Sequence, residues 1–329
     1  MNDDFSVIDD DQIENTWNIE SMERAKQRKK EARKGKEEEV LLETKVKEAR
    51  YRCEQINTSK INDITNYFVE QDTQFALKQL LSQHIAKVKL EEHIYNMSPA
   101  GLIPAFEFVS KTEFIKNNIC FEISKKNGVI EKISNIDEIN SNWVRYRDTE
   151  LEDCKYIRRI KQINRKGFEE IKKAGDLQFS SDNPQLEEEY RRCLFYFICF
   201  DAYLVKPITD IQPFNFLYLS TIVPPVTIPV EFSYKLISEN NGIQRIRKVG
   251  KPMLNDELIG EIRKKYDEYH KAYIKYGFTE FRFKFNVDIE FNVKEKIVES
   301  ARLQINEQIA DNIEATCDFK LRKLNNYVK

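Results

Sequence analysis

The chain has 329 residues, of which 41% are hydrophobic and 33% are charged, and its formal net charge is only −2. This length holds one large domain or two modest ones, and 21 Phe and 15 Tyr residues allow a sizeable core. The near-neutral net charge excludes a uniformly basic protein of the kind that binds nucleic acid, so nucleic-acid binding would require local basic patches.

The beginning of the chain is acidic. Residues 1–20 contain seven acids and no base, and hydrophobic side chains such as Phe5, Ile8 and Trp17 are spaced among them. A like-charged block is typical of a disordered tail, whereas spaced hydrophobic residues are typical of a segment that docks on a partner. Because this start has no apolar signal segment and the six Cys are scattered, we expect an intracellular, reducing compartment with free thiols.

Residues 21–58 are rich in bases at first and are expected to form a charged helical arm. Eight bases lie between residues 21 and 36, and nearly all residues there are strong helix formers. A solvated helix is one interpretation, and an arm that contacts phosphate groups is the other. The bases that would make such contacts are Arg28, Lys29, Lys30 and Arg33.

Residues 59–329 are predicted to form a compact body that contains several long helices. The apolar residues of 61–95 fit one broad helical face, and Asn183 followed by Pro184 is typical of a helix start. The expected helices span residues 61–95, 150–173, 184–205, 256–276 and 295–325. The second half of the helix 184–205 is apolar all round, so we expect it to be buried on every side.

Strand patterns lie between these helices. Residues 281–293 alternate without interruption between apolar and polar side chains, which predicts a long half-buried strand. Two further pairs of strands flank Asn127-Gly128 and Asn241-Gly242, and Asn-Gly is a strong signal for a tight hairpin turn. The sequence therefore predicts an α+β protein with a mainly antiparallel sheet, packed by helices. No membrane span is expected, because Asp201 or prolines interrupt the apolar runs.

Few residues form a pattern that could carry catalysis. Asp288 and Glu290 share the polar face of the long strand, and two such carboxylates could hold Mg²⁺ in a nuclease. The alternative is a solvated strand face on which the carboxylates pair with basic neighbours. The chain lacks the glycine-rich phosphate-binding motifs and the His and Cys motifs of metal sites, so we expect neither cofactor nor metal.

A nucleic-acid role would rest on basic residues of the body together with the arm. The candidates in the body are Arg158, Arg159, Arg245 and Arg247. We nevertheless expect a non-catalytic structural or assembly subunit that binds other protein subunits. The expected assembly is a homo-oligomer or a large complex, such as a viral particle or connector. A nucleic-acid-binding factor and a metal-dependent nuclease are the alternatives.

Overall fold

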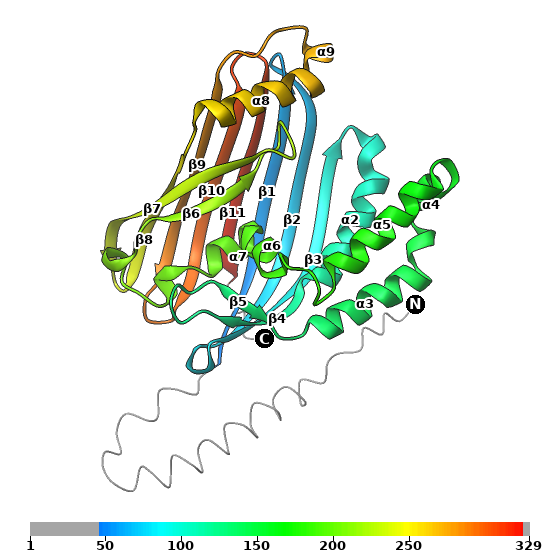
Figure 1. The fold of residues 1–329 in the computed structure, drawn as a ribbon. Coiled ribbons are helices and arrows are strands. Elements are labelled where there is room, and N and C mark those ends of the chain that lie inside the picture. Colours follow the sequence, from blue (N-terminus) through cyan, green and yellow to red (C-terminus); the bar gives the residue numbers. More distant parts are fainter. Residues whose placement is uncertain (1–45, 325–329) are drawn as a thin grey trace, which may run out of the picture. The chain divides into compact units, whose positions relative to one another are not determined.

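A computed structural model describes residues 46–324, which combine α-helices with one large antiparallel sheet (Figure 1). The predicted α+β class with a mainly antiparallel sheet is confirmed at this level. The predictions on the acidic tail, and those on residues 21–45 of the arm, lie outside the described residues. No helix in the described part of the chain is both long and apolar enough to cross a membrane.

Eleven strands form the sheet, and each pairs with its neighbours in antiparallel register. The strands are β1 (Lys47–Ile61), β2 (Ile64–Leu80), β3 (Ile85–Ser98), β4 (Asn118–Ile123), β5 (Ile130–Ile133), β6 (Phe214–Leu219), β7 (Thr227–Asn240), β8 (Ile243–Pro252), β9 (Phe281–Asn292), β10 (Ile297–Ile309) and β11 (Ile313–Leu324). Their order is β5-β4-β3-β2-β1-β11-β10-β9-β8-β7-β6. The first and last strands of residues 46–324, β1 and β11, therefore pair in the middle of the sheet, and β5 and β6 form its two edges.

Helices lie on one face of the sheet and beyond its β3 side (Figure 1). The α-helices are α2 (Ile103–Lys116), α3 (Ile136–Thr149), α4 (Lys155–Ile163), α5 (Arg165–Gln178), α6 (Leu186–Arg192), α7 (Leu194–Cys199), α8 (Asp256–Tyr269) and α9 (Lys271–Ile274). Short 3₁₀ turns connect several of them, including Ala100–Leu102 before α2 and Ala202–Leu204 after α7. Figure 1 shows α8 across the ends of the central strands and α6 with α7 over the middle of the face.

The short helix α7 is the centre of the hydrophobic core. Phe195 stacks on Phe75 of β2, with ring centroids 4.2 Å apart. Phe197 packs on Phe232 of β7 and Phe285 of β9, at 5.3 and 5.6 Å. Because α7 contacts strands from both halves of the sheet, the sheet must curl around it. The expected burial of this apolar segment on every side is confirmed, since residues 195–200 are all buried.

Strand β9 matches the alternating pattern from which it was predicted. Phe281, Phe285, Val287, Ile289 and Phe291 are buried, while the residues between them are exposed or half-buried. The apolar side chains face the core and the polar side chains face outward, as a period of two requires.

Two predicted helices are wrong, because both segments form pairs of strands. Residues 61–95 form most of β2 and β3, which are joined by a turn in which His84 has a φ of 56°. Of the segment 295–325, residues 297–309 form β10 and residues 313–324 form β11, joined at Asp311 with a φ of 63°. The burial of β10 and of the second half of β2 alternates with a period of two, and long-range pairing supplies the backbone hydrogen bonds that a helix would have made locally.

Other predicted boundaries also require correction. Residues 47–58, which were assigned to the helical arm, belong to β1 in the middle of the sheet. The helix predicted over 150–173 is divided at Asn164, whose side chain caps the N-terminus of α5. The helix predicted over 184–205 ends at Cys193 and restarts as α7, because Cys193 has an extended backbone with ψ of 131°. The helix predicted over 256–276 is likewise interrupted at His270.

Candidate functional site

The two candidate catalytic carboxylates lie on the outer face of β9 and are paired with arginines. Asp288 accepts a hydrogen bond of 2.7 Å from Nε of Arg247, and Glu290 lies 3.5 Å from Nε of Arg245. Glu290 also accepts a hydrogen bond of 2.8 Å from Ser300 on β10. No group of three or more His, Cys, Asp or Glu side chains within residues 46–324 is placed to hold a metal ion.

These pairs bring together residues for which different roles were predicted. The guanidinium groups of Arg245 and Arg247 would contact phosphate, and the carboxylates would bind metal, yet here each partly neutralises the other. All four side chains are at least 43% exposed, so the pairs are open to solvent and screened by salt. Both roles stay predictions.

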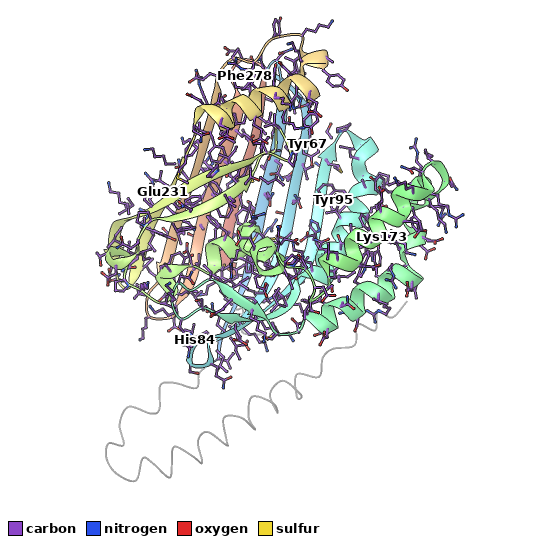
Figure 2. All side chains as sticks on the ribbon, in the orientation of Figure 1. Tyr67, His84, Tyr95, Lys173, Glu231 and Phe278 are labelled. Carbon is purple, nitrogen blue, oxygen red and sulfur yellow. The ribbon has the colours of Figure 1, made fainter. Side chains whose placement is uncertain are left out.

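The basic residues of the body do not form one surface. Arg158 and Arg159 lie on α4, which packs on α2 beyond β3, whereas Arg245 and Arg247 lie on β8. Six strand-to-strand spacings separate β3 from β8, or roughly 29 Å along the sheet at about 4.8 Å each. In Figure 2, Lys173 of α5 and Glu231 of β7 lie on opposite sides of the view. The arm residues Arg28, Lys29, Lys30 and Arg33 lie outside the described part of the chain, as do Phe5, Ile8 and Trp17.

A surface groove is formed where α4 and α5 meet the turn before α2, and we call it the helical groove. It has a volume of about 400 Å³. Its lining consists of Gly101, Tyr156, Arg159, Ile160, Ile163, Asn164, Gly167 and Ile171. Four of these eight side chains are large and apolar, which is typical of a site that binds an apolar group.

The break between α4 and α5 produces this groove. Asn164 ends α4 and caps α5 by accepting a hydrogen bond of 3.0 Å from the backbone N–H of Gly167. A Cβ atom on Gly167 would lie only 2.7 Å from Nδ2 of Asn164, so a larger residue there would require this capping side chain to shift. Ile157 and Phe168 fix the pair of helices in the core, while Ile163 stays 73% exposed.

The two helices that form the helical groove are basic in sequence, although Arg158 lies 3.9 Å from Asp153 just before them. Residues 155–178 contain eight bases and three acids, a net charge of +5. Lys161 pairs with Glu152 at 2.6 Å, and Lys166 lies 3.7 Å from Glu170. Arg159 lines the groove itself and is exposed. The groove therefore combines an apolar floor with positive charge, which suits an acidic segment that carries apolar side chains.

A second feature is a buried ion pair in the core, which we call the lysine cluster. The ammonium of Lys248 on β8 lies 2.6 Å from Asp201, and the two side chains are only 1% and 6% exposed. The other carboxylate oxygen accepts hydrogen bonds of 2.6 Å from the Tyr234 hydroxyl and from the backbone N–H of Ala202. The Lys248 ammonium also lies 3.4 Å from the ring centroid of Phe197.

The environment of the lysine cluster perturbs its acid–base behaviour. Burial lowers the pKa of Lys248, and the charge of Asp201 opposes this shift without cancelling it. Burial, with the nearby Asp201 carboxylate, raises the pKa of Tyr234 well above its usual value. A buried charge is costly unless it is paired and hydrogen-bonded, so this arrangement makes each member depend on the others.

Sequence reasoning missed both this cluster and a second buried acid. Lys248 lies between Ile246 and Gly250 on the inward positions of β8, and that alternation could have identified it. Glu307 occupies an inward position of β10, where it accepts hydrogen bonds from the Ser220 hydroxyl and, at 2.8 Å, from the Thr221 N–H. Burial raises the pKa of Glu307. Its bonds fix the loop between β6 and β7.

Comparison with known protein families finds no matching family model, and comparison with curated proteins finds no matching sequence. The function must therefore be argued from the geometry of this chain. The features that carry chemistry within residues 46–324 are the helical groove, the lysine cluster and the paired charges on the outer face of the sheet.

Proposed function

We propose that the protein is a non-catalytic structural or assembly subunit of a larger intracellular complex, of which a viral particle or connector is one setting. The observation that carries this proposal is the helical groove, whose apolar floor lies within a surface of net positive charge. Ile163 at 73% exposure and Tyr156 at 36% both line this groove, so a partner that covers them would remove apolar area from water.

The chemistry of the groove defines its partner. A net charge of +5 over residues 155–178 favours a negatively charged segment, and the apolar floor requires that segment to carry apolar anchors. Residues 1–20 of the sequence have this composition, with seven acids, no base and the hydrophobic residues Phe5, Ile8 and Trp17. The proposed partner is therefore a second copy of the chain, which would supply this segment in an oligomer.

A nucleic-acid-binding factor is the second candidate, and the same basic helices favour it. Phosphate contacts would use Arg158, Arg159 and their neighbours, whereas the apolar floor would contribute nothing to a backbone-tracking surface. Ile163 thus distinguishes the two candidates, because a protein partner would cover its exposed side chain, whereas phosphate contacts would not involve it. A metal-dependent nuclease built on Asp288 and Glu290 is the third candidate, and its carboxylates are already paired with arginines.

Binding of a labelled peptide to the full chain tests the proposal. A fluorescent peptide of residues 1–20 is titrated with a full-length chain that is wild type in the groove but carries Ser at positions 5, 8 and 17, so that its own segment does not compete for the groove. Binding is followed by anisotropy. Ile163→Glu should weaken binding at least about tenfold, because it places a charge of the same sign as the peptide on the groove floor. A peptide in which Phe5, Ile8 and Trp17 are replaced by Ser should also bind weakly, through loss of its anchors.

Ile64→Glu provides a matched control, because Ile64 is 72% exposed at the start of β2 and lies outside the groove. This variant should bind the peptide like the wild type. Equal loss in both variants, or no binding by the wild type, would contradict the assembly proposal. A labelled DNA duplex that binds with a steep salt dependence, and that is released by Arg158→Ala and Arg159→Ala but not by Ile163→Ala, would favour the second candidate.

A further inference from the structure

A cavity that is partly open to solvent lies where the two edges of the sheet approach each other. The turn of the β4–β5 hairpin forms one side through Asn127, Val129 and Ile130, and the start of β6 forms the other through residues 214–216. The cavity has a volume of about 250 Å³. Because β5 and β6 are the two edge strands and do not pair with each other, we call this space the seam cavity.

The hairpin turn is fixed against the core at this point. Gly128 has a φ of 70°, and a Cβ atom there would lie 2.1 Å from the backbone oxygen of Asp201. Any larger residue would push the hairpin away from the segment that holds the lysine cluster. The seam cavity therefore has one wall whose position depends on Gly128, and its size is set by the fold.

The lining of the seam cavity combines aromatic rings with charged side chains. Five of its thirteen residues are aromatic, including Phe197 and Phe216, and Lys248 and Asp201 line it as well. The other polar residues of the lining are Arg191, Glu188, Asn127 and Asn215. An apolar cavity with a few convergent polar groups is the usual form of a small-molecule site.

The hydrogen bonds in the cluster show which group is open to a ligand. Asp201 already accepts from Lys248, Tyr234 and the Ala202 N–H. An ammonium has three donors, and the Lys248 ammonium uses one of them on Asp201, while aromatic rings surround the rest. Lys248 thus keeps capacity to donate to one more acceptor inside the cavity.

The charges that line the cavity indicate whether its ligand is charged or neutral. The two cations that line the cavity, Lys248 and Arg191, are matched by Asp201 and Glu188. An anionic ligand would leave one uncompensated buried charge, whereas an uncharged oxygen acceptor would not. We propose that the seam cavity binds a small, uncharged and largely apolar molecule through a carbonyl or hydroxyl oxygen that accepts a hydrogen bond from Lys248. This inference goes beyond the proposed assembly function and does not depend on it.

Three probes of similar size test the inference on the full-length chain. Ligand-observed NMR titrations would compare benzyl alcohol, toluene and benzoate, which carry a hydroxyl, no acceptor and a negative charge, respectively. Benzyl alcohol should bind saturably with a Kd on the order of 1 mM, as expected for a ligand of this size. It should bind at least about fivefold tighter than either of the other two probes, because only it supplies an uncharged acceptor.

Two substitutions show whether binding occurs in the seam cavity. Val129→Trp fills the cavity from the half-buried hairpin side and should abolish binding of benzyl alcohol. Leu217→Trp places the same side chain on β6 at a position that is 46% exposed and outside the cavity, and should leave binding unchanged. No saturable binding of benzyl alcohol, or binding that survives Val129→Trp, would overturn the site. Binding of toluene or benzoate as tight as that of benzyl alcohol would overturn the assigned ligand class.

Discussion

Two neighbouring residues of β8 form ion pairs in opposite environments. Lys248 and Asp201 are 1% and 6% exposed, whereas Arg247 and Asp288 are 51% and 55% exposed at almost the same distance. A buried charge has lost its hydration and depends on its partner, while water and salt screen an exposed pair. The same type of interaction therefore has different consequences one residue apart.

Removing each cation in turn should show this difference. Lys248→Met leaves Asp201 buried without a counter-charge and should lower the free energy of unfolding by about 3–5 kcal/mol. Arg247→Met leaves Asp288 in water, where solvent and salt screen it, and should lower the free energy of unfolding far less. Chemical denaturation measures both values. Adding Asp201→Asn to Lys248→Met should recover part of the loss, and equal effects of the two single substitutions would contradict this assignment.

A thiol on β11 should make stability depend on alkaline pH. Burial raises the pKa of Cys317 from its usual 9.0 to about 12. Above pH 9 the unfolded chain therefore loses this proton while the folded chain keeps it, so stability falls as the pH rises towards 12. One group contributes at most about 1.4 kcal/mol per pH unit in this window.

Urea denaturation of the wild type and of Cys317→Ser from pH 8 to pH 10 measures this contribution. The variant should lose stability less steeply above pH 9, because it lacks the thiol that ionises in the unfolded state. Parallel slopes for the two proteins would show that Cys317 does not hold its proton in the folded state.

At the scale of single elements, β9 has one face packed in the core and the other exposed to solvent. The ring of Phe285 lies 4.9 Å from that of Phe232 on β7 and 5.6 Å from that of Phe197 on α7. Lys284, the preceding residue, faces outward and is exposed. Each residue thus reports on a different face of one strand.

Substitution by Ala at these two positions should have very different effects on stability. Phe285→Ala removes a buried ring and leaves a cavity, so it should lower the free energy of unfolding by about 3–5 kcal/mol. Lys284→Ala should change it by no more than about 0.5 kcal/mol. Thermal and chemical unfolding would measure both changes. A nearly silent Phe285→Ala would mean that this ring contributes little to the core.

The strands that could be predicted from sequence are those with strict local patterns. In β9 every inward position is apolar, so its period of two is visible without knowing its neighbours. In β10 the inward position 307 is a buried Glu, which breaks the pattern, and the segment was therefore predicted to be helical. In β2 the exposed Ile64 adds an apolar residue that does not follow the strand period.

The candidate sites were harder to predict than the strands, because their residues come together only through long-range contacts. Lys248 and Asp201 are separated by 47 residues, and no local pattern connects them. Ile163 could be recognised as part of an apolar stripe, but its exposure follows from the break at Asn164. The fold class could thus be predicted from local alternation and turns, whereas the sites arise from contacts between distant elements.

At the scale of the whole molecule, the sheet is continuous from β5 to β6 through the pairing of β1 with β11. The helical groove lies beyond the β3 side, and the lysine cluster lies near the other edge, on β7, β8 and the segment after α7. Substitutions in one feature should therefore be close to additive with substitutions in the other. This separation allows assembly through the groove to be tested without disturbing the core.

The native mass of the purified full-length protein tests the assembly proposal most directly. The account predicts a mass of two or more times 39.1 kDa, free of nucleic acid by its ultraviolet absorbance ratio, for the wild type and for Ile64→Glu. Ile163→Glu should shift the mass to that of a single chain while its melting temperature stays within a few degrees of the wild type. A wild type that remains at 39.1 kDa at every concentration, or an oligomer that is unchanged by Ile163→Glu, would contradict assembly through the helical groove.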